Sequence, residues 1–317
     1  MKQNNTPCQE KFKTMIGGQA LIEGIYMRGP EKQAIVVRSK DGLVTKVEPI
    51  KTNKDRNPIF GWPLIRGVVN FGASMVCGVK ALMFSANYFP DDEQTEPGKL
   101  DRWLEKHIPS EKLEQVAVYV AVLLGAAFSV GLFFLLPTFL VGLIPGVREI
   151  IWLRNLLEGL VKIGIFLAYL IGISKMKDMR RIFSYHGAEH KTIRCYEAGL
   201  PLTVENVRPM TRLHPRCGTS FLFVVIFISI LLGAVIQTPN TLLRMALHLL
   251  LLLPVVAVSY EINRFVGRHD NWFTRMITAP GMWLQNFTTN EPDDSMIEVG
   301  IESIKLVIPA REGADKW

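Results

Sequence analysis

Two histidines and a glutamate stand close together in the segment YHGAEHK near the middle of the chain. His186 and His190 are four residues apart, so on a helix both imidazoles lie on one face, about one turn from each other. Glu189 lies three residues after His186 and approaches the same face. Two imidazoles beside a carboxylate suit a borderline divalent ion. The segment therefore predicts a metal site, with zinc as the expected ion and iron as the alternative.

The spacing H-x-x-E-H is also that of the inverted zincins. In such sites the ion lowers the pKa of a bound water to about 7, and the neighbouring glutamate acts as the general base. We therefore predict that Glu189 is catalytic. The alternative is that Glu189 is itself a ligand or orients one. Gly187 works against a helix here, because glycine is a poor helix former.

Further residues of metal-ligand type follow in the same stretch. The chain has six histidines and four cysteines, and Cys195, His214 and Cys217 lie shortly after the histidine pair. We expect His214 or Cys217 to be the third ligand, with Cys195 less favoured. Three protein ligands leave a position open for water, as catalytic zinc requires. The alternatives are a closed structural site of His186, His190, His214 and Cys217, or a histidine pair at the lipid headgroups.

The elements around this segment are apolar enough to cross a membrane. The chain of 317 residues is 49% hydrophobic with a mean hydropathy of +0.21, which indicates membrane spans mixed with polar segments. Four stretches reach the roughly 20 residues that a bilayer requires. They are residues 116–144, 150–173, 219–237 and 241–261. Residues 59–90 are also apolar, but Arg66 and Lys80 bracket only 13 residues, so we expect an interfacial or re-entrant helix there.

The charge of the loops predicts the orientation. The loop 174–218 carries nine basic residues, whereas the link 145–149 carries only Arg148. The positive-inside rule then places this loop and both termini in the cytoplasm of a multi-pass membrane protein. The formal net charge of +7 is too small an excess to indicate a nucleic acid. The lipid bilayer is the expected partner, and the sequence is compatible with a homo-oligomer.

The two ends of the chain predict smaller elements. Residues 34–50 alternate apolar and polar side chains on both sides of Asp41 and Gly42, which predicts a β-hairpin with a tight turn. The preceding GGQALIEG is rich in glycine, which permits close backbone approach. Residues 278–310 predict amphipathic helices, the second of which is capped near Asp293. We expect this last helix to pack against the hairpin.

The predicted fold class is an α-helical polytopic membrane protein. It has about four transmembrane helices, an interfacial helix, a small N-terminal β-hairpin unit and a cytosolic loop that resembles a metal site. The predicted segments are the β-rich unit 1–58, the interfacial helix and linker 59–112, spans one and two in 113–173, the cytosolic loop 174–218, spans three and four in 219–262, and the cytosolic amphipathic segment 263–317.

Two further polar groups could serve a site. Arg154, Glu158 and Lys162 repeat every four residues inside the second span, so they share one helix face. Such charges face the bundle interior or a wet cavity and could form part of a substrate path. The alternative is that Arg154 extends outward to the membrane surface. After the fourth span, His269 and Asp270 could orient a ligand or add one, or belong to a solvated segment.

Four segments of the chain resemble the YqhQ-like family. They are GGQALIEGIYMRGP, YHGAEHKTIRCYE, RLHPRCGTSF and APGMWLQNFTTNEPDDSMIEVGI, and the resemblance extends over residues 15–308. It implies an uncharacterised bacterial membrane protein, described in general terms as a predicted metal-dependent enzyme. By this resemblance, the motif segments contain His186, Glu189, His190, His214 and Cys217.

The leading hypothesis for function is a membrane-embedded metal-dependent hydrolase. It would act at the cytoplasmic face on a membrane peptide or a lipid-linked substrate. The second hypothesis is a non-enzymatic scaffold or assembly factor whose metal is structural. A third is a transporter component that uses the face of Arg154, Glu158 and Lys162, although an inverted repeat is not visible in the sequence.

Overall fold

The computed structural model describes residues 11–50, 58–88, 110–147, 149–311 and 313–317. The chain divides into two compact units that interleave along the sequence. Unit 1 comprises Met1–Phe89, Tyr169–Ile228 and Leu253–Trp317, and unit 2 comprises Pro90–Ala168 and Ser229–Leu252.

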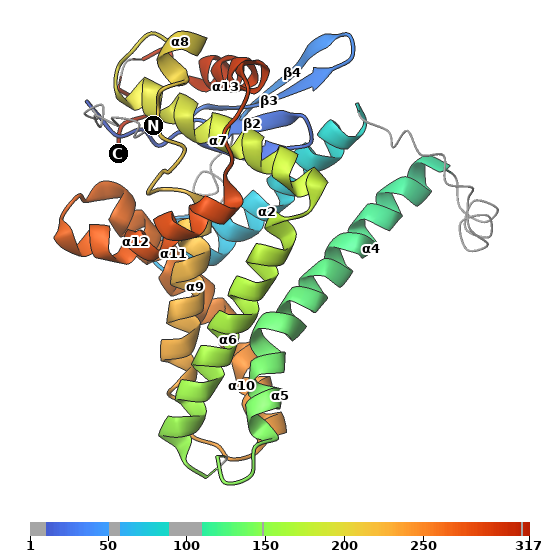
Figure 1. Cartoon of the computed structure of the whole chain (residues 1–317), viewed down its shortest axis with the longest axis vertical. Coiled ribbons are helices and arrows are strands. Elements are labelled where there is room, and N and C mark those ends of the chain that lie inside the picture. The colour runs from blue at the N-terminus through green and yellow to red at the C-terminus, as the bar shows by residue number, and fades with distance from the viewer. Residues whose placement is uncertain (1–10, 51–57, 89–109, 148, 312) are drawn as a thin grey trace. The chain divides into compact units, whose positions relative to one another are not determined.

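Unit 1 contains a four-stranded antiparallel sheet in the order β1-β2-β3-β4 (Figure 1). The strands are β1 (Gly17–Leu21), β2 (Gly24–Arg28), β3 (Lys32–Ser39) and β4 (Gly42–Pro49). The predicted hairpin is β3–β4, whose turn places Gly42 at a φ of 127° that favours glycine. Strands β1 and β2 extend that hairpin into a sheet, and their glycines interrupt the alternation by which strands are recognised.

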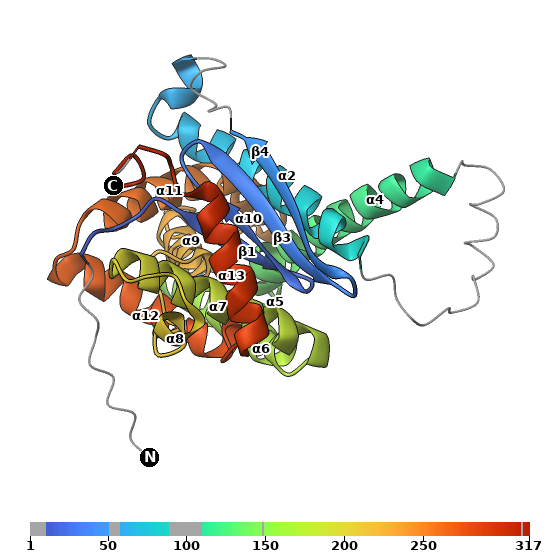
Figure 2. The same cartoon turned by 90° about the horizontal axis from the view of Figure 1, so that it is seen from above.

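Both faces of this sheet are covered by helices of unit 1. Ile25, Met27 and Val36 point to one face, where they pack against α7 (Lys177–Glu197) and α13 (Asp294–Val307). Figure 2 shows α13 lying over the sheet. Residues of the opposite parity, such as Tyr26 and Ile35, pack against Ala81 of α2 (Ile65–Ala86). The strand period of two thus divides the apolar side chains between two helical layers.

The predicted C-terminal helix is α13, and its start is capped as expected. The Asp293 carboxylate accepts a hydrogen bond from the Met296 N–H at 3.0 Å. The helix also packs against β2 and β3, which agrees with the predicted docking on the N-terminal unit.

The segment 174–218, predicted as a loop, is mostly helical. The helix α7 has 21 residues and is followed by the short helix α8 (Val204–Val207) and an irregular stretch up to Gly218. Gly187 does not break α7. It allows another segment to approach the helix closely, since a Cβ there would lie 2.0 Å from the Asn290 carbonyl oxygen. The remaining helical elements of unit 1 are the 3-10 turn Pro58–Gly61, α12 (Trp272–Thr288), and most of α9 (Gly218–Gly233) and α11 (Leu252–Arg268).

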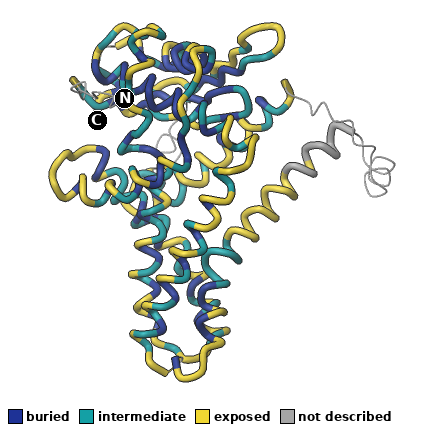
Figure 3. The backbone as a smooth tube through the Cα atoms, in the orientation of Figure 1, coloured by how far each residue is buried: buried dark blue, intermediate teal, exposed yellow. Residues whose placement is uncertain are grey.

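Unit 2 contains apolar helices with outward-facing side chains. They are α4 (Ser110–Val130), the π-helical turn Gly131–Leu135, α5 (Leu136–Gly142), most of α6 (Ile151–Ser174) and α10 (Thr241–Leu250). The π turn lies just before Pro137, which cannot donate the regular backbone hydrogen bond. Figure 3 shows exposed residues along α4, and Leu123 and Leu124 are 68% and 65% exposed. Apolar side chains so exposed are suited to lipid.

Three helices are long and apolar enough to cross a membrane by length and composition, or four if a bent pair counts as one span. They are Ile65–Ala86, Tyr119–Gly142 and Ile151–Ser174, and the bent pair is α10 with α11, at 43°. This set includes α2, for which an interfacial helix was predicted. In contrast, the predicted third span is α9, whose 16 residues rise only about 24 Å. The predicted linker is the end of the segment 59–112, and residues 89–109 lie outside the described residues.

Candidate metal centre

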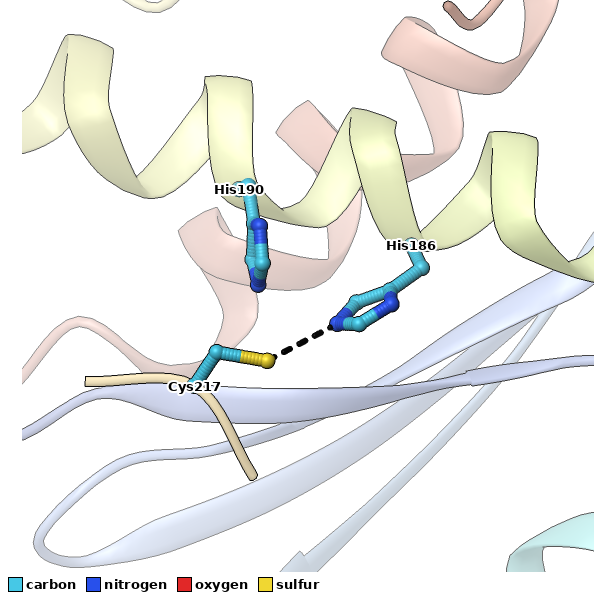
Figure 4. Close-up of side chains that lie close together, drawn as sticks. All are labelled: His186, His190 and Cys217. Atoms are coloured by element: carbon cyan, nitrogen blue, oxygen red, sulfur yellow. Dashed lines mark hydrogen bonds between the residues drawn. The ribbon is translucent and has the colours of Figure 1, made fainter. Parts of the chain in front are cut away.

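Three side chains of unit 1 bring metal-ligand atoms together. His186, His190 and Cys217 each offer one such atom, and all three atoms lie within 4.8 Å of one another. His186 Nε2 is 3.1 Å from Cys217 Sγ, and Figure 4 shows the two rings and the sulfur converging. The histidines come from successive turns of α7, and Cys217 directly precedes α9. Residues up to 31 positions apart in sequence thus meet in one group. The sequence predicted His186 and His190 as ligands and left the third open between His214 and Cys217.

Backbone carbonyl groups fix the orientation of both imidazoles. His186 Nδ1 lies 2.8 Å from the carbonyl oxygen of Thr288, and His190 Nδ1 lies 2.6 Å from that of Arg212. A carbonyl only accepts, so each Nδ1 carries a proton, and Nε2 is the nitrogen that has the lone pair in the neutral form of the ring. Metal-binding histidines are held by the same kind of bond from the second ring nitrogen.

Glu189 is buried beside this group. Its side chain is 4% exposed, and Oε2 has no hydrogen bond among the described residues. The Gly18 N–H donates to the carboxyl group. Burial raises the pKa of Glu189 to about 7, although the neighbouring His186 and the Gly18 N–H act in the opposite direction. Thr288, whose carbonyl holds His186, likewise has a buried hydroxyl without a partner among the described residues.

Gly18 makes room for that carboxyl group. A Cβ at this position would lie 2.4 Å from the Tyr26 carbonyl oxygen and 3.2 Å from Glu189 Cδ. Strand β1 therefore reaches the site only because residue 18 has no side chain.

The titration of the other two buried groups also favours metal binding. Burial lowers the pKa of His190 to about 4, so its ring is neutral at physiological pH. Burial alone would raise the pKa of Cys217, but His190 and contacts to Thr219 outweigh it and the pKa is lowered. Neutral imidazole and thiolate are the forms that bind metals.

His214 lies near the group but has another partner. Its ring centroid is 5.6 Å from that of His190, and its Nε2 is 3.2 Å from Glu197 Oε2. Burial lowers the pKa of His214, and the nearby Arg216 lowers it further. His214 is not a member of the ligand group found among the described residues.

The remaining predicted site residues of unit 1 lie elsewhere. Cys195 is buried with Val207 and Ile297 and its sulfur faces the Pro201 carbonyl at 3.6 Å. His269 donates from Nδ1 to the Phe265 carbonyl, and Asp270 accepts from Arg275.

Three residues that were not predicted position the site. The amide of Gln285 makes two 2.7 Å bonds with the backbone of His214 and so holds the turn that leads to Cys217. The buried carboxylate of Glu197 accepts from the Thr14 N–H and from Arg216. Gly18 is the third. The glycine pair at residues 17–18 and the segment WLQNFTTNEP were the available signals, and neither indicates a partner by itself.

Arg154, Glu158 and Lys162 lie together in unit 2, as their spacing predicted. Glu158 accepts from Arg154 Nε at 3.0 Å and from Arg244 Nε at 2.9 Å. Lys162 donates to Ser229 Oγ at 3.1 Å and lies over the Phe134 ring. Arg154 is fully buried and does not extend outward.

The surroundings of this cluster complete its hydrogen bonds. Arg154 also donates to the Pro239 carbonyl at 3.0 Å, and Arg244 donates to the Ile236 carbonyl at 2.5 Å. His248 Nε2 is 3.9 Å from Glu158 Oε2. The cavity among these groups measures about 10 Å³, which is room for about one water. Arg244 and His248 were not predicted as members.

Fold and site together define a mostly helical protein with three to four candidate membrane helices and a histidine–cysteine group that could bind a metal. The family model described as "Protein of unknown function (DUF1385)" matches residues 62–310. The chain is 32% identical to "Uncharacterized protein YqhQ" of Bacillus subtilis (strain 168) over 306 residues, which cover 95% of this chain and 94% of that protein. The chain belongs to this YqhQ-like, DUF1385 family. No solved structure matches it.

Proposed function

We propose that the chain is a membrane-associated metal-dependent hydrolase whose ion is held by His186, His190 and Cys217. The observation that supports this is the group of three ligand atoms within 4.8 Å of one another, beside the Oε2 of Glu189, which has no hydrogen bond within the described part of the chain. Two imidazoles and a thiolate fit zinc, with iron as the alternative. When bound, such an ion supplies Lewis acidity that makes water a nucleophile near neutral pH.

The chain's own residues have distinct roles in this proposal. Glu189 is the general base, because its free Oε2 is a buried acceptor in the site. The Gly18 N–H holds the carboxyl group in place. The carbonyls of Thr288 and Arg212 keep both Nε2 atoms directed at the ligand position.

The partners of His214 favour a catalytic site over a structural one. A closed zinc site has four protein ligands, whereas a catalytic site has three and an open position. His214 would be the natural fourth donor, but its Nε2 faces Glu197 and its backbone is held by Gln285. The predicted substrate is a membrane peptide or a lipid-linked molecule at the cytoplasmic face, which is consistent with three to four candidate spans.

Metal analysis of the detergent-purified protein tests the ligands. We expect about one equivalent of metal in the wild type, and its loss in His186→Ala and Cys217→Ser. His269→Ala and Cys77→Ser are matched controls outside the group and should keep the metal. Unchanged metal content in both ligand variants would refute the proposal.

Cobalt substitution tests the open position and the role of Glu189. In the cobalt(II) protein, added azide should change the visible spectrum, because it enters the open position. Glu189→Gln should keep the cobalt but shift the pH dependence of that spectrum, because the acceptor beside the open position is lost. A spectrum that responds neither to azide nor to Glu189→Gln would favour the structural site.

A further inference from the structure

A groove of unit 1 lies beside the chain segment that carries Cys217. It has a volume of about 420 Å³, within the range of about 300–1,000 Å³ that is usual for ligand pockets. Its walls come from the N-terminal segment, the turn before Cys217, the end of α11 and one face of α12. Pro215 and Arg216 line it, so the groove and the candidate metal centre share one turn.

The walls are held together by buried polar contacts. The carboxylate of Glu197, which is fully buried, accepts from the Thr14 N–H at 2.9 Å and from Arg216. The Lys13 carbonyl accepts from the Trp317 N–H at 3.2 Å. The backbone of Lys13 and the side chain of Arg216, which belong to two different walls, are therefore held in position by the fold.

The groove carries an excess of positive charge. Glu197 neutralises Arg216. Asp270 is shared between Lys13 at 3.7 Å and Arg275 at 2.8 Å, which leaves one of these two cations without a counter-charge of its own. An anionic group is the complement of such a wall.

The groove also has an apolar part, next to the polar side chains of His269, Thr274 and Thr278. Val266, Ala279 and Met282 line it. The adjacent face of α12 exposes Trp272, Met276 and Trp283, which are 76%, 56% and 53% exposed. These positions recur at helical spacing, and tryptophan favours the membrane–water interface.

The position of α12 in the chain indicates a membrane interface. It begins four residues after α11 ends, and α11 belongs to the bent pair counted as a candidate span (Figure 1). An amphipathic helix after a span has its apolar face at the lipid boundary. A ligand with an anionic head and apolar chains matches the groove better than a soluble anion.

We propose that this groove binds the anionic phosphate headgroup of a membrane lipid. Lys13 and Arg275 bind the phosphate, and the face of Val266, Ala279 and Met282 contacts the start of the acyl chains. That this lipid is the substrate class of the metal centre rests on the proposed function, whereas the binding itself does not.

Native mass spectrometry of the full chain with added lipid tests the proposal. We expect phosphatidylglycerol to bind more tightly than phosphatidylcholine. Lys13→Gln and Arg275→Gln should each weaken phosphatidylglycerol binding about fivefold, as expected for one basic residue at an anionic headgroup. Lys305→Gln, an exposed charge change on α13, is the matched control and should leave it unchanged.

The outcomes separate the two proposals. Equal binding of both lipids, or equal phosphatidylglycerol binding in the wild type and both groove variants, would overturn the inference. Displacement by millimolar inorganic phosphate would also overturn it, because the site would then bind a free anion. Loss of metal in His186→Ala with lipid binding retained supports the groove, and retained metal in the Arg275→Gln protein shows that its lipid defect does not come from the metal centre.

Discussion

Two buried polar clusters in this protein differ in how far their hydrogen bonds are satisfied. In unit 2, Glu158 lies between two guanidinium groups, which also donate to backbone carbonyls. In unit 1, Glu189 has an oxygen that finds no partner among the described residues, beside three convergent ligand atoms. Buried charges alone therefore do not identify a binding site. A hydrogen-bond acceptor without a partner beside metal-ligand atoms is the feature that indicates a ligand. The unit 2 cluster is instead a structural ion-pair network.

The largest effect on stability should follow from breaking the ion-pair network in unit 2. Glu158→Gln leaves Arg154 and Arg244 buried without a counter-charge, which should lower the free energy of unfolding by about 3–5 kcal/mol. Thermal unfolding in detergent measures this, and the metal content should not change. Asp294→Asn, which breaks an exposed ion pair with Arg208, is the control and should cost less than about 1 kcal/mol. A loss of stability as small as that of the control would mean that the cluster is not a structural ion-pair network.

Removal of the metal should destabilise unit 1 by a smaller amount. At a free metal concentration of 100 times Kd, binding stabilises the folded state by about 2.7 kcal/mol. A chelator should therefore lower the unfolding temperature of the wild type but not that of His186→Ala. If the chelator shifts both proteins equally, its effect does not come from this site.

The same Glu→Gln change at Glu189 should raise the free energy of unfolding instead of lowering it. In the metal-free protein it replaces a buried carboxylate that lacks one partner, so we expect stabilisation of about 1–3 kcal/mol. The pKa of Glu189 is raised to about 7, so the penalty of its charge appears as the pH rises from the ordinary value towards 7 and is absent in acid. Unfolding at pH 5 and pH 8 measures the difference, and a destabilised variant at pH 8 would contradict the comparison.

Lys162→Met should have the smallest effect. Lys162 donates its hydrogen bond to Ser229 rather than to Glu158, and it lies over the Phe134 ring. Methionine keeps the apolar stem and removes a buried charge, so the free energy of unfolding should change by less than about 1 kcal/mol. A loss of stability as large as that of Glu158→Gln would mean that Lys162 belongs to the ion-pair network.

Local features of the site could be predicted from the sequence, and long-range ones could not. The spacing of His186 and His190, the turn at Gly42 and the cap at Asp293 depend on neighbours within four residues. The partner of His214 does not, because Glu197 and Gln285 reach it only in the folded chain. The position of α2 also depends on a distant partner, because Arg66 is paired with Glu261, 195 residues away. Such a pair offsets a charge that argued against a span when the segment was considered alone.

The bond between His186 and the Thr288 carbonyl joins residues that are 102 positions apart. Chains are synthesised at about 5–20 residues per second, so roughly 5 to 20 seconds separate the synthesis of these two residues. During that interval His186 lacks the contact that selects its tautomer. The order of biosynthesis therefore delays a fully oriented set of candidate ligands until nearly the whole chain exists, and the metal loading that we propose would be a late event in the maturation of the protein.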